Sequence, residues 1–115
     1  MPSGDVALLE PLPTYSVRLH RLDPTLAELR IAFADLPADV QVSGRLMGPR
    51  CKGMSTVEIA YPLRPHSFPE WSVLIPEPML WEEDAPYIYG GPVEFRRDGK
   101  PVGKILVSCG IKVGS

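Results

Sequence analysis

The densest set of ionisable side chains is the acidic run Glu82-Glu83-Asp84, inside the stretch PEPMLWEEDAPYIY at residues 76–89. Two carboxylates that face each other across a substrate, about 5–9 Å apart, would be the pair that hydrolyses a glycoside. Three adjacent acids before Pro86 instead fan out from a turn, and the D-x-D-x-D-G spacing of a calcium loop is missing. We therefore expect a solvated turn that neither catalyses a reaction nor binds a metal.

The histidines and cysteines also predict no catalytic or metal site. His20 and His66 are far apart, and Cys51 and Cys109 lie outside any CxxC motif. We expect surface histidines and two free thiols, with a single disulfide as the alternative. The motifs GxSxG, GxGxxG and GxxxxGK[ST] do not occur. The sequence therefore predicts a chain without a catalytic residue, a cofactor or a metal.

Charge and hydropathy exclude two classes of partner. Twelve basic and fourteen acidic residues give a formal net charge of −2, and the basic residues are scattered. Nucleic acid and anionic membranes require clustered Lys and Arg, so we expect neither as a partner. No apolar run approaches the ~20 residues that span a bilayer, and the first residues do not resemble a secretory signal. We expect a soluble chain of unknown compartment.

Period-two alternation of apolar and polar residues recurs along the chain, with Pro and Gly between the alternating segments. Asp98-Gly99 is a strong hairpin signal. The pattern predicts an all-β fold, an immunoglobulin-like antiparallel β-sandwich of about seven strands with Greek-key connections; a closed barrel is the alternative. The strands are expected within residues 15–23, 26–35, 39–47, 54–63, 71–75, 87–97 and 104–113. Residues 1–13 are expected to be a loose lead-in to a single domain at 14–115.

The aromatic residues around the acidic run favour a structural corner. Trp81 is large enough to close one end of the sandwich, and Pro86 fixes the direction in which the chain enters the next strand. Tyr89 suits a tyrosine corner, with its ring in the core and its hydroxyl on upstream backbone, and Tyr87 competes for that role. The alternative is an exposed sugar-stacking platform made by Trp81, Tyr87 and Tyr89.

The same residues carry a likeness to a known family. Pro78, Leu80, Trp81, Pro86, Ile88 and Tyr89 match a "P-x-LW-x-x-x-x-P-x-LY" segment, with Ile88 in place of the last Leu. The hairpin RRDGKPVG and the ending Gly110-Ile111-Lys112 follow, with Lys112 where the pattern has Arg. This order resembles the immunoglobulin-like sandwich domain of the family 2 glycoside hydrolases, the group of β-galactosidases, β-glucuronidases and β-mannosidases. The resemblance implies that catalysis belongs to a separate (β/α)₈ barrel, so it assigns no catalytic residue to this chain.

These observations favour a non-catalytic module that acts as a scaffold or an interaction domain, with a catalytic barrel or another protein as its partner. The alternative is a carbohydrate- or protein-binding module. Its candidate binding patch is formed by His66, Phe68 and Trp71, provided that these side chains are exposed. A small enzyme in its own right is the third hypothesis.

Overall fold

The computed structural model describes residues 8–113, and every regular element in that range is a β-strand. Among these residues no helix is long and apolar enough to cross a membrane. The strands are β1 (Thr14–Asp23), β2 (Leu26–Ala34), β3 (Gln41–Arg50), β4 (Ile59–Pro62), β5 (Arg64–Ser67), β6 (Glu70–Pro76), β7 (Ile88–Arg97) and β8 (Lys100–Cys109).

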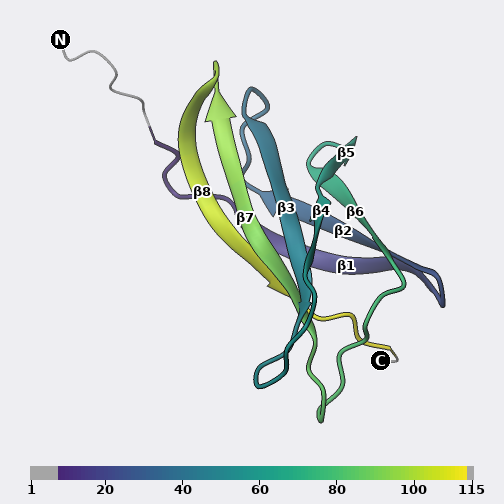
Figure 1. The fold of residues 1–115 in the computed structure, drawn as a ribbon. Helices are drawn as coiled ribbons and strands as arrows, with labels where there is room; N and C mark the ends of the chain where they lie inside the picture. The colour runs from purple at the N-terminus through teal and green to yellow at the C-terminus, as the bar shows by residue number, and fades with distance from the viewer. Residues whose placement is uncertain (1–7, 114–115) are drawn as a thin grey trace.

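The eight strands form two antiparallel sheets of four that pack face to face (Figure 1). The first sheet has the order β1-β2-β6-β5 and the second sheet has the order β4-β3-β7-β8. The connections from β2 to β3, from β4 to β5 and from β6 to β7 cross between the sheets. Apart from the added edge strand β4, this is the strand arrangement of a constant-type immunoglobulin domain. The predicted all-β sandwich is therefore confirmed.

The core lies between the sheets and follows the alternation in the sequence. On β2, Leu29, Ile31 and Phe33 are all at most 2% exposed, while the residues between them face outward. Phe33 contacts both sheets, because its ring packs edge-on against Trp71 and against Phe95, each at 5.5 Å between centroids. Burial of these large apolar side chains is the main favourable contribution to the stability of the fold.

The hairpin between β7 and β8 forms where the sequence predicts it. Asp98 and Gly99 have φ angles of 52° and 76°, so both lie in the left-handed region that a two-residue hairpin loop requires. At the other end of β7, Gly91 lies against β3. A Cβ atom there would overlap the carbonyl oxygen of Arg45, which explains why glycine occupies this strand position.

The structure differs from the prediction at three strands. The strand expected at 104–113 is β8 at Lys100–Cys109, so residues 110–113 lie outside it. The segment expected to be one strand at 54–63 begins only at Ile59, and residues 51–58 form a loop in which Val57 is 84% exposed. The first half of the predicted strand is therefore wrong, because Val57 and Ile59 are both exposed and the alternation there does not mark a buried face. The strand β5 was not expected, because all four of its residues are exposed and show no alternation. It forms by backbone pairing with β6 at the sheet edge.

The lead-in is attached to the domain at its end. Residues 1–7 lie outside the described residues, but Leu9 N donates to Val102 O at 2.9 Å and Pro13 is buried. Tyr15 extends the same contact, because its hydroxyl accepts from Ser108 N at 3.1 Å. These bonds satisfy backbone groups along the outer edge of β8, which would otherwise be free to pair with another chain.

Candidate functional site

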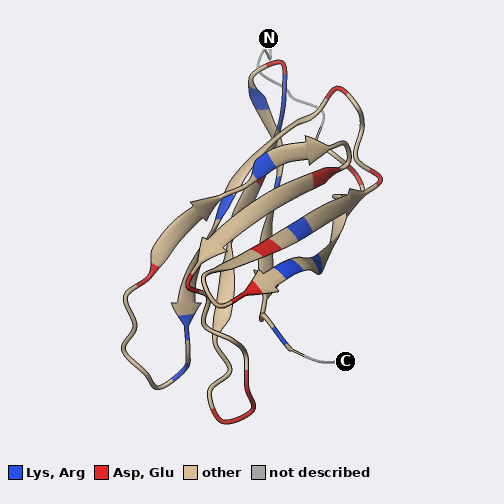
Figure 2. Cartoon of the chain, turned by 90° about the vertical axis from the view of Figure 1, so that its right-hand side faces the viewer, with Lys and Arg blue, Asp and Glu red and all other residues tan. Residues whose placement is uncertain are grey.

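The acidic run lies at the tip of a loop that projects from the sandwich (Figure 2). Glu82 and Ala85 exchange two backbone hydrogen bonds of 3.1 Å, and the three acidic side chains are exposed. Within residues 8–113, no three His, Cys, Asp or Glu side chains are grouped so that they could hold a metal ion. The structure thus places these acids in a solvated turn.

Tyr89 occupies the tyrosine-corner position at the start of β7. Its side chain is 1% exposed, and its hydroxyl accepts a hydrogen bond of 3.0 Å from Met79 N in the β6–β7 connection. Burial raises the pKa of the Tyr89 phenol. Its ring packs edge-on against Tyr61, with 6.1 Å between centroids. Tyr89 therefore anchors the connection that carries the acidic run.

Tyr87 has a different position from Tyr89. It precedes β7, it is half-buried, and its hydroxyl has only a weak contact of 4.0 Å with the sulfur of Met54. Pro86 pairs with Trp81 in an isolated bridge at the base of the acidic turn. Of the two tyrosines that compete for the corner, the structure places Tyr89 there.

Trp81 joins the corner to the C-terminal segment. Its backbone N–H donates to Ile111 O at 2.8 Å, and its ring lies directly against Gly110, where a Cβ atom would be 2.7 Å from Cδ1. The Lys112 ammonium lies 4.2 Å from the ring centroid, which is a cation–π contact. The half-buried indole is therefore occupied by contacts within the chain, as a structural corner requires.

The predicted binding patch does not form as an exposed aromatic surface. Trp71 is only 8% exposed, because its ring points into the core against Phe33. Phe68 is 54% exposed and touches only the edge of Trp71, at 6.3 Å between centroids. The condition that all three side chains are exposed is not met by Trp71, since the inward face of β6 holds Trp71, Val73 and Ile75 together.

His66 belongs to a polar network on the outer face of the first sheet. Arg30 Nη1 donates to His66 Nε2 at 2.7 Å, and Arg30 Nε pairs with Glu28 at 2.8 Å. The hydrogen bond from Arg30 holds the pKa of Glu28 below its ordinary value. His20 makes a similar contact with Arg18 at 3.3 Å. Arginine can only donate hydrogen bonds, so both histidines accept here. The bond to His66 spans β6 and links β2 to β5, whereas the bond to His20 lies within β1.

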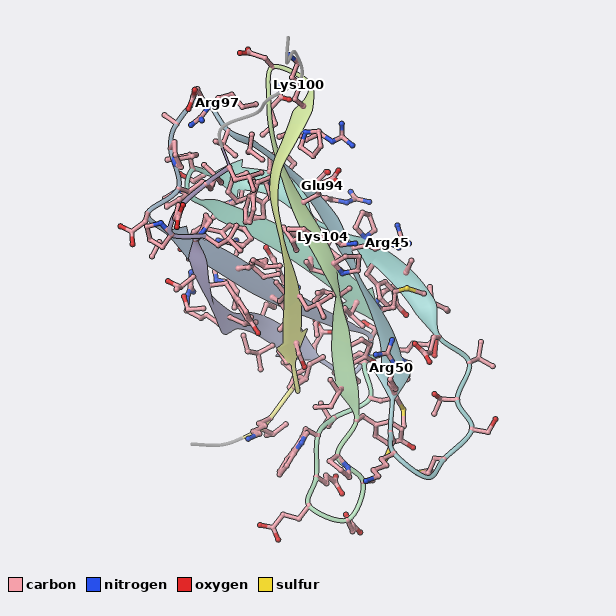
Figure 3. All side chains as sticks on the ribbon, turned by 90° about the vertical axis from the view of Figure 1, so that its left-hand side faces the viewer. Arg45, Arg50, Glu94, Arg97, Lys100 and Lys104 are labelled. Atoms are coloured by element: carbon pink, nitrogen blue, oxygen red, sulfur yellow. The ribbon has the colours of Figure 1, made fainter. Side chains whose placement is uncertain are left out.

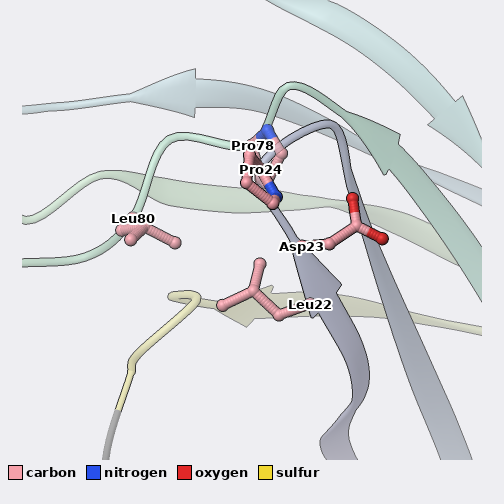
Figure 4. A pocket seen from close by; sticks show the side chains of 5 residues that line it. All are labelled: Leu22, Asp23, Pro24, Pro78 and Leu80. Carbon is pink, nitrogen blue, oxygen red and sulfur yellow. The ribbon is translucent and has the colours of Figure 1, made fainter.

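An apolar hollow lies at one end of the sandwich, between the β1–β2 turn and the β6–β7 connection (Figure 4). It encloses about 330 Å³ and is lined by Leu22, Asp23, Pro24, Pro78 and Leu80. The one carboxylate, Asp23, already accepts hydrogen bonds from Thr25 N and Oγ1 at 3.0 and 2.9 Å. These bonds lower the pKa of Asp23. The hollow therefore offers apolar contact without a free polar group.

The outer face of the second sheet carries apolar side chains that the sequence analysis did not single out. Leu106 is 73% exposed on β8, although the opposite face of the sheet covers the core. A groove of about 310 Å³ crosses β3, β7 and β8 beside it. We call this the outer groove; its apolar and glycine lining is Met47, Ile88, Gly90, Gly91, Pro92, Leu106 and Val107, with Arg50 and Ser108 at its border.

A second hollow adjoins the outer groove on the same face and carries charge (Figure 3). We call this the basic hollow; it encloses about 300 Å³ and is lined by Ser43, Gly44, Arg45, Pro92, Glu94 and Lys104. Pro92 lines both hollows, so they lie next to each other. This face therefore places an apolar groove beside two cations, Arg45 and Lys104, and one carboxylate, Glu94.

The signal for this surface is present in the sequence but is weak. Met47, Pro92 and Leu106 have the outward parity of their strands, where alternation predicts polar residues. Gly90-Gly91 leaves room between them, because neither residue has a side chain. Only knowledge of which strands are neighbours shows that these residues from three strands meet.

Comparison with protein-family models gives no match, and a search of curated proteins finds no similar protein.

Proposed function

We propose that this chain is a non-catalytic β-sandwich module that binds another protein through the outer groove. The single observation that carries the proposal is the 73% exposure of Leu106 beside an apolar groove that spans three strands. Apolar side chains that gather around a groove on a protein surface mark interaction sites. The fold adds a rigid platform, because the strands that present the groove are fixed by the core on their other face.

The corner formed by Trp81, Pro86 and Tyr89 suggests the kind of protein in which such a module would act. Trp81, Pro86 and Tyr89 tie the β6–β7 connection to the core and to Gly110-Ile111-Lys112. The order of these residues resembles the sandwich domain that accompanies the catalytic barrel in family 2 glycoside hydrolases. A catalytic barrel is therefore one class of partner that the proposal includes.

Protein binding is preferred to carbohydrate binding because of where the aromatic rings lie. A sugar stacks on the open face of an aromatic side chain. Trp71 and Tyr89 are 8% and 1% exposed, and the ring of Trp81 is in contact with Gly110 and Lys112. Of the proposed patch, Phe68 is exposed and so is His66, whose imidazole is hydrogen-bonded to Arg30, but Trp71, the third residue of the patch, is buried.

Affinity capture with matched variants tests the proposal. The wild-type chain, Leu106→Asp and Val57→Asp are used as baits, since Leu106 lies in the groove and Val57 is equally exposed on a loop outside it. We expect a protein that the wild type and Val57→Asp retain and Leu106→Asp loses, and direct binding of that purified protein. Identical capture by all three baits would contradict the proposal. Binding to a glycan array, or product release from a panel of chromogenic glycosides, would favour the other two hypotheses.

A further inference from the structure

We infer that the partner presents an extended acidic peptide segment, with an apolar side chain for the outer groove and carboxylates for the basic hollow. The inference rests on the proposed function and specifies the chemistry of its partner. It follows from three features of one sheet face: a groove for an apolar side chain, a neighbouring pair of cations that form no ion pair within the described residues, and a fixed distance between the groove and these cations.

The two hollows form one track along β7. Gly90 lies in the outer groove, Pro92 borders both hollows, and Glu94 lies in the basic hollow. These residues alternate along one strand face, so from Gly90 to Glu94 the track runs about 13 Å at ~3.3 Å per residue. An extended segment that follows the track would place its carboxylates about two to four residues from its apolar side chain.

Arg45 and Lys104 supply the charge for this track. Both are exposed, and among residues 8–113 neither forms an ion pair. The other basic side chains of this face have partners: Arg50 pairs with Glu58 at 2.8 Å, and Arg96 pairs with Glu94 at 2.7 Å. The one carboxylate in the hollow, Glu94, lies opposite Lys104 in the pairing of β7 with β8, but its ion pair is with Arg96. The hollow therefore keeps an excess of positive charge from Arg45 and Lys104.

This charge pattern favours an acidic peptide over other anionic partners. A protein that binds a nucleic-acid duplex usually makes about six or more phosphate contacts, and its affinity then falls about a thousandfold as salt is raised. In the part of the chain that the structure describes, this face offers only two cations that form no ion pair, Arg45 and Lys104. A groove that accepts an apolar side chain beside those cations suits a peptide, in which apolar and carboxylate side chains alternate. The chain as a whole has a net charge of −2. An acidic segment would therefore be attracted to this positively charged face rather than to the rest of the surface.

The acidic run of a second copy is the nearest alternative occupant, because residues 78–84 read PMLWEED. In the folded chain Leu80 packs against the core and Trp81 packs against Gly110, so the apolar side chains of this run are already used. Met79, at 39% exposed, is the only one available for an apolar anchor. A separate acidic segment therefore fits the track better than a second copy does.

Fluorescence polarisation with synthetic peptides tests the inference directly. Three fluorescein-labelled twelve-residue peptides are used: one with a Leu followed two to four residues later by Glu residues, one with Lys in place of Glu, and one with Ser in place of Leu. We expect the first to bind the wild-type chain most tightly and to weaken as salt is raised. The Lys peptide and the Ser peptide are each expected to bind at least about fivefold more weakly.

Two matched pairs of variants locate the binding site. Arg45→Glu/Lys104→Glu is expected to weaken the acidic peptide at least about fivefold, whereas Lys52→Glu/Lys100→Glu changes net charge equally and leaves the two hollows intact. Leu106→Asp is expected to weaken it at least about tenfold, with Val57→Asp as its control. Circular dichroism and thermal unfolding establish that all four variants fold.

The outcomes separate this inference from the proposed function. If the acidic peptide fails to bind, or binds equally to the two charge-reversed variants, the inference is overturned. If a captured protein depends on Leu106 but not on Arg45 and Lys104, the proposed function stands and the acidic partner is wrong. If sedimentation shows that the chain dimerises and Glu82→Lys/Glu83→Lys abolishes the dimer, the second copy is the occupant and the inference is overturned.

Discussion

Replacement of Tyr89 by Phe removes one hydroxyl group and leaves the ring that fills the core. That hydroxyl accepts the Met79 N–H at 3.0 Å in a side chain that is 1% exposed. After the substitution the Met79 N–H loses its partner, because the C–H group that replaces the hydroxyl cannot accept a hydrogen bond. A hydrogen-bonding group left unsatisfied in this way costs about 1–3 kcal/mol of unfolding free energy.

This loss is large enough to measure by urea denaturation. With an m-value of about 2 kcal/mol/M for a domain of this size, a cost of about 2 kcal/mol lowers the urea midpoint by ~1 M. The slope m should stay unchanged, because the surface exposed on unfolding is the same. Tyr87→Phe is the matched control, since its hydroxyl makes only the 4.0 Å contact with Met54 and is expected to change the midpoint by less than about 0.2 M.

The comparison of the two variants decides which tyrosine forms the corner. A Tyr89→Phe chain with the wild-type midpoint would refute the role assigned to its hydroxyl. A Tyr87→Phe chain that loses as much stability as Tyr89→Phe would refute the assignment of the corner to Tyr89.

Three further predictions concern the core, a thiol and the surface network. Trp71→Ala should cost about 3–5 kcal/mol of unfolding free energy because it leaves a cavity in the core. Phe68→Ala should cost less than about 1 kcal/mol. Equal losses of stability in urea denaturation would show that Trp71 is not a core residue. Burial raises the pKa of the Cys109 thiol to about 11, and Cys51 is buried. Native protein at pH 8 should therefore react slowly with a thiol reagent, and both thiols should react fully only in urea. Fast reaction of the native chain would contradict this. The Arg30 hydrogen bond lowers the pKa of Glu28 below its ordinary 4.5, so the folded state binds fewer protons there than the unfolded state. The stability gained from Glu28 is therefore present above pH 4.5 and is lost as pH falls through the lowered pKa. In the wild type the urea midpoint should fall between pH 5.5 and pH 3, and Glu28→Gln should make this fall smaller. The exposed control Glu83→Gln should leave the fall unchanged.

Alternation was sufficient to predict most of the fold, because one face of each long strand is buried. The inward sets on β2 and β6 follow directly from the apolar positions of their sequences. Alternation fails where neither face is covered. The strand β5 has four exposed residues and is held by backbone hydrogen bonds to β6, which leave no pattern in side-chain type.

The same rule explains which site predictions failed. Trp71 shares the parity of Val73 and Ile75, so alternation already implies that it is buried, and its closeness in sequence to Phe68 and His66 was misleading. The bond between Tyr89 and Met79 was accessible from sequence because the two residues lie only ten positions apart. The contacts of Trp81 with Gly110 and Ile111 join more distant segments of the chain. The outer groove was not, because it joins residues from three strands whose order only the structure supplies.

The central claim is that the outer face of β3, β7 and β8 binds an acidic segment, and amide chemical shifts test it most directly. Isotope-labelled chain would be titrated with the Leu- and Glu-containing peptide while heteronuclear spectra are recorded. We predict shift changes that concentrate at Met47, Gly90, Lys104 and Leu106 and that saturate with the affinity measured by polarisation. Changes that concentrate on β1, β2, β5 and β6, or no changes at peptide saturation of the polarisation signal, would contradict the claim.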